Sequence, residues 1–204
     1  MTNTEQTAAA PTEDVEPETT SGLPHLPGDS AMWVMVLGDL LIFGAYFIIF
    51  MIYRTMAPAE FLASQQHLSV IVGVVNTVVL LTSSWFIARS VLAARAGNHK
   101  RAIRLTYLGG AFGVGFILIK AYEWTTELAH GYTLSSNDFF MFYYMLTGVH
   151  VFHVALGLLI LGIVVRELRN PRKRRTSMVE SGGIYWHMVD LLWIVIFGLL
   201  YVMR

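Results

Sequence analysis

Five long apolar blocks constrain this sequence more than any other feature. They occupy residues 31–53, 68–93, 103–124, 139–165 and 183–203, and short polar connections separate them. A helix rises about 1.5 Å per residue, so about 20 residues cross the hydrocarbon core of a bilayer, and every block is long enough. Charged residues make up 14% of the chain, against about 25% in soluble domains, which points to lipid as the solvent. The pattern predicts an all-α, polytopic membrane protein in which residues 31–204 form one bundle of five transmembrane helices.

The first 30 residues differ from the rest of the chain. They contain six acidic residues and no Lys or Arg. A stretch of this kind buries too little apolar surface to offset the entropy lost on ordering, so we predict a disordered acidic tail over residues 1–30. The tail also lacks the basic and apolar regions of a signal peptide.

Basic residues in the connections predict the orientation of the bundle. The second connection, around residues 89–104, holds five Lys or Arg residues, and the fourth, around residues 166–175, holds six. The first connection has one, Arg54, and the third has none. Because basic loops tend to stay inside, we predict a cytoplasmic N-terminus and an external C-terminus in a bacterial cytoplasmic membrane. One basic run is either this topology signal alone or also a contact for anionic lipids: Arg172, Lys173, Arg174 and Arg175.

Several functional classes are disfavoured by what the sequence lacks. A formal net charge of zero argues against a nucleic-acid partner, which needs a basic face. The absence of Cys removes disulfides, zinc–thiolate sites and iron–sulfur clusters. There is no nucleophile elbow, phosphate loop, dinucleotide fingerprint or carboxylate-rich metal site. We therefore predict no catalytic centre and no metal site in this chain.

Charged side chains inside a membrane are costly and mark packed or functional faces. Asp39 lies in the first block without a cation one turn away on its own helix. It must be neutral, pair with another helix or meet water. Two interpretations stay open: a carboxylate that serves a partner protein or a proton route, and a buried acid that is hydrogen-bonded to a neighbouring helix.

Two further groups of polar residues share helix faces. Lys120 and Glu123 are three residues apart, a spacing that favours an internal ion pair over a ligand site. His187 and Asp190 have the same spacing and can pair, and Trp186 lies beside them where an aromatic belt belongs. We expect these residues to contribute to interhelical polar contacts.

His150 and His153 are a third pair, near the middle of the fourth block. A membrane histidine is a possible haem ligand. Two histidines on one face of one helix supply only one side of a haem, and His187 lies at a different depth. A role in interhelical polar contacts therefore fits these histidines better than haem ligation.

The third block contains Gly109 and Gly113, a small-xxx-small spacing that lets helices approach closely. This spacing predicts that the helix packs against protein rather than lipid on that face.

Motifs in all five blocks resemble, in order, those of subunit III of the haem–copper oxidases, the cytochrome c oxidase subunit 3 family. The most specific is YWHMVDLLWI at residues 185–194, which looks like the last helix of that family. The others are TGVHVFHV at 147–154, NTVVLLTSS at 76–84, AYEW at 121–124, and the segment from Trp33 to Phe43 that contains Gly38 and Asp39. Residues 27–29, 37–39, 139–141 and 179–183 resemble most the five-helix accessory subunit associated with nitric oxide reductase.

The resemblance implies a subunit that binds no haem or copper itself. It would dock on catalytic subunit I of a haem–copper oxidase or nitric oxide reductase, stabilise it and support its proton uptake, with membrane lipids as further partners. The metals, haem with copper or iron, would belong to the catalytic subunit of this oxidoreductase complex. Asp39 would match the buried carboxylate of the family. The alternatives are a stand-alone b-type membrane cytochrome and a small proton or solute transporter.

Overall fold

The computed structural model describes residues 30–170 and 176–203, which are helical apart from short connections. The helices are α1 (Ser30–Met56), α2 (Pro58–Gln65), α3 (Val70–Arg95), α4 (His99–Ala129), α5 (Asp138–Arg169) and α6 (Thr176–Phe197), which continues as a π-helical turn over Gly198–Val202. Five of these helices are long and apolar enough to cross a membrane. The predicted all-α fold with five spanning helices is confirmed.

Four of the five spanning helices are longer than the apolar blocks that predict them, and α3 has the length of its block. The third block spans residues 103–124, whereas α4 has 31 residues and starts at His99. Its first turn is polar and is capped by Asn98, whose side chain accepts a hydrogen bond from the Arg101 amide at 3.2 Å. A helix of that length, about 46 Å at about 1.5 Å per residue, extends past a hydrocarbon core of about 30 Å. Hydropathy therefore locates the spanning part of each helix but not its polar ends.

The short helix α2 was not predicted. It occupies the polar first connection, begins with Pro58 at its first position and is only eight residues long. It packs against α5, where Phe61 is buried and meets Phe139 edge-to-face. This contact closes one end of the bundle, which we call the α2 end. The opposite end carries the α3–α4 turn and is called the basic end.

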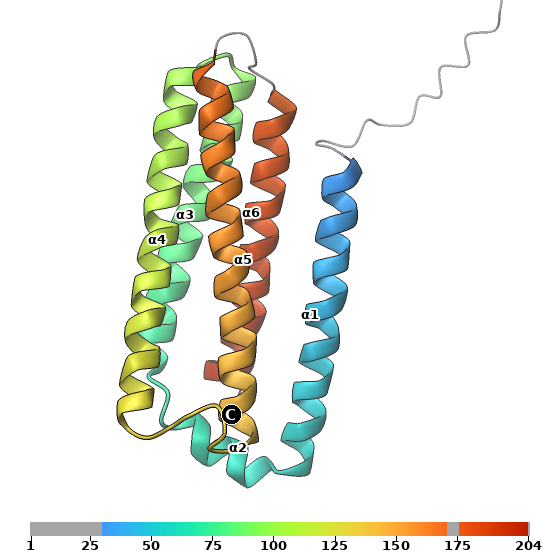
Figure 1. The fold of residues 1–204 in the computed structure, drawn as a ribbon, viewed down its shortest axis with the longest axis vertical. Helices are drawn as coiled ribbons and strands as arrows, with labels where there is room; N and C mark the ends of the chain where they lie inside the picture. Colours follow the sequence, from blue (N-terminus) through green and yellow to red (C-terminus); the bar gives the residue numbers. More distant parts are fainter. Residues whose placement is uncertain (1–29, 171–175, 204) are drawn as a thin grey trace, which may run out of the picture.

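Helices α3, α4, α5 and α6 form a four-helix bundle, and α1 lies to one side of it (Figure 1). In the most apolar stretch of α6, 61% of the residues are buried, whereas in that of α1 only 17% are buried. Helix α6 is therefore the central element and α1 the peripheral one, packed mainly against α5 and α6. The predicted tail over residues 1–30 and the run from Arg172 to Arg175 lie outside the described residues, apart from Ser30, which starts α1.

Glycines allow the helices to approach around Trp186, a fully buried side chain of α6. A Cβ atom at Gly113 would lie 2.7 Å from the Trp186 ring, and one at Gly157 would lie 2.9 Å from it. A Cβ atom at Gly109 would lie 2.6 Å from Ile87 of α3. The prediction that the Gly109–Gly113 face packs against protein is confirmed.

This packing predicts a site-specific response to added side-chain volume. Gly157→Val should destabilise the bundle by about 1–3 kcal/mol, because the new methyl groups overlap the buried Trp186 ring and the ring has no free space to move into. Gly148→Val is the matched control on the same helix, since a Cβ atom there would meet nothing within 4 Å. Thermal unfolding in detergent measures both. Equal Tm values for the two variants would contradict the packing described here.

Candidate functional site

The polar residues that the sequence places inside the membrane do not form one cluster. The structure divides them among three separate groups along the bundle, which centre on Lys120, on Asp39 and on His187. His150 stands apart from all three. Each group joins different helices, so each is described by itself.

The Lys120 group is the most buried of the three. Lys120 is 0% exposed and Glu123 is 4% exposed, and their Nζ and Oε2 atoms lie 3.0 Å apart. The Lys120 ammonium also donates to the Tyr201 hydroxyl at 2.7 Å and to the Tyr143 hydroxyl at 3.3 Å. The Tyr201 hydroxyl in turn donates to Glu123 Oε1 at 2.5 Å. The internal ion pair expected from the spacing is therefore present, and it links α4 to α5 and to the end of α6.

Aromatic faces surround the Lys120 ammonium as well. Its Nζ lies 4.6 Å from the ring centroid of Tyr143 and 5.3 Å from those of Trp193 and Tyr201. Cation–π attraction and hydrogen bonds together replace the water that the charge has lost. Tyr143 and Tyr201 belong to no pattern that predicted this group from the sequence. The one feature of the sequence that points to them is a tyrosine inside an apolar span, because its buried hydroxyl group needs a hydrogen-bond partner.

The Asp39 group joins the peripheral helix α1 to α5. Asp39 Oδ1 lies 3.5 Å from Nε2 of His153, and the two side chains are 19% and 14% exposed. Asp39 therefore faces a side chain of another helix, an arrangement that is compatible with both interpretations left open for it. These two side chains are also more accessible than the Lys120–Glu123 pair.

The contact made by Nδ1 of His153 indicates how many protons the contact between Nε2 and Asp39 requires. Nδ1 lies 2.8 Å from the carbonyl oxygen of Val149, an acceptor, so Nδ1 carries a proton. An attractive contact between Nε2 and Asp39 then needs a second proton between them. Either the carboxyl group donates to a neutral imidazole, or an imidazolium donates to a carboxylate. Asp39 and His153 thus form a pair that can hold one exchangeable proton.

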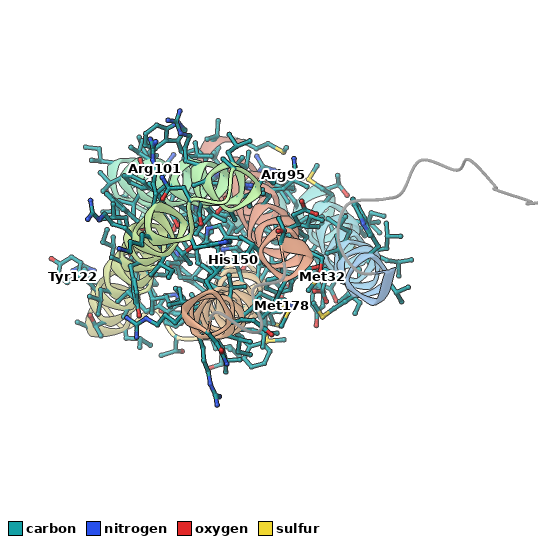
Figure 2. The ribbon with its side chains drawn as sticks, turned by 90° about the horizontal axis from the view of Figure 1, so that it is seen from above. Met32, Arg95, Arg101, Tyr122, His150 and Met178 are labelled. Atoms are coloured by element: carbon teal, nitrogen blue, oxygen red, sulfur yellow. The ribbon has the colours of Figure 1, made fainter. Side chains whose placement is uncertain are left out.

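His150 lies at the centre of the bundle, viewed along the helices in Figure 2. It is 0% exposed, and neither ring nitrogen has a hydrogen-bond partner among the described residues. Its ring packs between Phe116 and Trp193, with centroids 5.6 Å and 5.3 Å away. His150 and His153 are three residues apart but have different neighbours, because His150 points into the four-helix bundle and His153 points toward α1.

The third group lies between α3 and α6. Ser84 Oγ and His187 Nδ1 are 2.6 Å apart, and the same nitrogen is 3.9 Å from Asp190 Oδ2. The Trp186 indole donates to Ser83 Oγ at 3.1 Å, and the Trp193 indole donates to Thr77 Oγ1 at 3.0 Å. Three hydroxyl groups of α3 therefore contact α6 at two levels, Ser83 with Ser84 at one and Thr77 at the other. These hydroxyls belong to the NTVVLLTSS motif at 76–84, and the seven-residue spacing of Thr77 and Ser84, which puts both on one helix face, was a usable signal.

The arrangement offers interhelical anchoring and one proton-holding pair. Within residues 30–170 and 176–203, no three His, Asp or Glu side chains converge in a way that could hold a metal ion. Aromatic rings pack against His150, and the two nitrogens of His153 face the Val149 carbonyl and the Asp39 carboxyl group.

Comparisons with known proteins agree with the motifs. A family model described as cytochrome c oxidase subunit III matches residues 28–204. A cytochrome c oxidase subunit 3 from Thermostichus vulcanus is 31% identical over 173 residues, which cover 83% of this chain and 84% of that protein. One from Synechocystis sp. is 32% identical, covering 83% of this chain and 73% of that protein. A heme-copper oxidase subunit I+III from Aeropyrum pernix is 30% identical over 84% of this chain, but this chain spans only 22% of that protein.

The Lys120 group yields a quantitative prediction. Lys120→Met should destabilise the protein by about 3–5 kcal/mol, because it leaves the Glu123 carboxylate buried without its cation. Replacing both residues with Met should recover much of that loss, since no uncompensated charge remains. Thermal unfolding in detergent measures the single and double variants.

The exposed ion pair at the basic end provides the control. Arg95 and Glu180 are 2.8 Å apart, with side chains that are 51% and 18% exposed. Arg95→Met should therefore cost about 1 kcal/mol or less. A Lys120→Met variant as stable as Arg95→Met would show that the buried pair does not stabilise the bundle.

Proposed function

The chain belongs to the cytochrome c oxidase subunit III family, and we propose that it is a non-catalytic membrane subunit of a haem–copper oxidase. One observation carries the proposal: the family model covers 28–204, the entire helical bundle, rather than one helix. The helix arrangement agrees, since the polar groups inside the bundle serve to hold helices together.

The proposed partner is catalytic subunit I. The Aeropyrum relative supports this, because its name assigns subunits I and III to one protein. The peripheral position of α1 and its exposed apolar side chains also leave a broad surface for a membrane partner or lipid (Figure 1). The distribution of basic loops supports a cytoplasmic N-terminus in a bacterial cytoplasmic membrane.

Haem and copper would belong to the catalytic subunit. Haem chemistry supplies oxygen binding and electron transfer there, whereas the residues of this chain position helices and hold protons. The enclosed ring of His150 and the Val149 and Asp39 contacts of His153 support this division, and they disfavour a stand-alone b-type cytochrome.

The parent complex would reduce either oxygen or nitric oxide. The names of the relatives favour an oxygen-reducing oxidase. The sign of the other branch is the resemblance of residues 27–29, 37–39, 139–141 and 179–183 to a nitric oxide reductase accessory subunit. We propose oxygen as the substrate of the parent complex.

Purification of the tagged chain from its native membranes in mild detergent tests the function. We expect a larger haem-containing subunit to co-purify, and the complex to consume oxygen faster than nitric oxide. The chain produced alone should show no Soret band and no proton flux in proteoliposomes. Stoichiometric haem in the isolated chain would establish the cytochrome alternative, and proton or solute flux would establish the transporter.

Asp39 should support proton uptake rather than carry every proton. Asp39→Ala should leave the initial turnover of an assembled complex largely intact but accelerate its decay over repeated turnovers. The reason is that the variant removes one member of a pair that can hold a proton, without touching the catalytic subunit. Oxygen consumption recorded over many turnovers measures this.

Carbodiimide labelling separates the two protonation states of the pair. A hydrophobic carbodiimide should label Asp39 if the carboxyl group holds the proton, and the label should disappear in Asp39→Asn. Complete loss of activity at the first turnover in an assembled Asp39→Ala complex would argue against a supporting role.

A further inference from the structure

Aromatic contacts hold α1 in place at its α2 end. The Phe50 ring packs edge-to-face on Phe61 and on Phe142, with centroid distances of 5.5 Å and 5.7 Å. The Tyr53 ring packs on Phe142 in the same way, at 5.2 Å. Edge-to-face pairs are attractive beyond the apolar surface that they bury. These contacts fix the end of α1 that joins α2.

The half of α1 nearer the basic end carries a polar contact with the bundle. Asp39 faces His153 of α5 at 3.5 Å, and the buried apolar side chains of α1 beside it include Val36 and Phe43. Lipid tails are as apolar as these side chains, so no hydrophobic driving force keeps them on the bundle rather than in lipid. The polar contact therefore has a large influence on whether this half of α1 stays packed.

One proton decides whether that polar contact attracts or repels. Nδ1 of His153 donates its hydrogen to the Val149 carbonyl, so Nε2 turns a lone pair toward Asp39 when the two side chains share no further proton. A carboxylate and a lone pair repel each other, whereas a proton between them makes a charge-assisted hydrogen bond. The contact is attractive while the pair keeps its proton and becomes repulsive once a rising pH removes it.

The neighbouring ionisable groups do not replace this proton. The Tyr185 hydroxyl of α6 donates to the His153 carbonyl at 3.5 Å and lies close enough to interact with the charge of Asp39. His150 interacts electrostatically with His153 but points into the four-helix bundle (Figure 2). The four residues on either side of Asp39 along α1 are not ionisable, and Asp39 makes no second ion pair within the described residues.

The connection between α1 and α2 allows α1 to tilt. Ala57, the residue between the two helices, has φ −134° and ψ 57°, which are not helical values. Pro58 has no amide hydrogen with which to continue the hydrogen-bond ladder of α1. A tilt of about 10° at this point would move Val34, about 35 Å away along α1, by about 6 Å.

We propose that Asp39 and His153 form a pH-sensitive latch between α1 and the bundle. While the pair holds its proton, the latch keeps α1 packed on α5. When the pair loses the proton, the half of α1 nearer the basic end moves away, and the contacts of Phe50 and Tyr53 keep the other end in place. The latch depends on the geometry of this pair and on the membrane-spanning fold, not on the proposed function, so either proposal can fail while the other holds.

Distances between two spin labels test the latch. The chain has no native cysteine, so introduced cysteines are labelled specifically. Val34→Cys on α1 and Leu159→Cys on α5 place the labels at two exposed positions of the full-length protein, which is studied in lipid nanodiscs by double electron–electron resonance. Between about pH 5 and about pH 9, we expect the ratio of long to short distances to rise about tenfold.

Two controls separate the latch from a general effect of pH. In Asp39→Asn, the side-chain amide donates to the neutral Nε2 atom of His153, so this isosteric variant should keep the short distance over the whole pH range. Labels at Met56→Cys and Leu128→Cys, also exposed positions, report on the fixed end of α1 in the protein with an intact latch, and their distance should not change with pH.

Three results would overturn the proposal. The first is a distance between residues 34 and 159 that is independent of pH. The second is an equal change with pH in Asp39→Asn, because another group would then be responsible. The third is an equal change between residues 56 and 128, because the whole of α1 would then leave the bundle or unfold.

Discussion

The absence of water from the hydrocarbon core is the constraint on which the rest of this structure depends. A lysine cannot remain charged there unless the chain replaces its hydration, and Lys120 is supplied with a carboxylate, two phenols and three aromatic faces. Those groups come from α4, α5 and the end of α6, so satisfying one charge fixes three helices at the α2 end. The same requirement acts on the indoles of α6, which donate to hydroxyls of α3.

The motif at residues 185–194 is therefore in large part a packing motif. Trp186 fills the space left by Gly113 and Gly157 and donates to Ser83, while Trp193 covers Lys120 and His150. These aromatic side chains are buried between helices and do not face lipid as the side chains of an aromatic belt do. Because each contact involves another helix, the identity of one residue of this motif restricts residues on α3, α4 and α5.

Features that depend on local composition could be predicted from the sequence. Features that depend on contacts between residues far apart in the chain could not. Hydropathy gave five spans, and a spacing of three gave the Lys120–Glu123 pair, because both are set within one helix. Tyr201 is 81 residues from Lys120, and no pattern along the chain connects them. The same limit applies to His150 and His153. Three residues in a helix turn the chain by about 300°, leaving the side chains about 60° apart, which is enough to place them against different neighbours.

The buried polar groups of this protein are candidates for a structural role, and the more accessible ones are candidates for a functional role. Lys120 and Glu123 are almost fully buried and bonded on several sides, which suits a structural role. Asp39 and His153 remain partly exposed, join α5 to the least buried helix, and need one proton to attract each other. Any partner or lipid that docks beside α1 changes the surroundings of that proton directly. On the proposed function, the peripheral contact rather than the most tightly bonded one is therefore where we expect this subunit to respond to the complex around it.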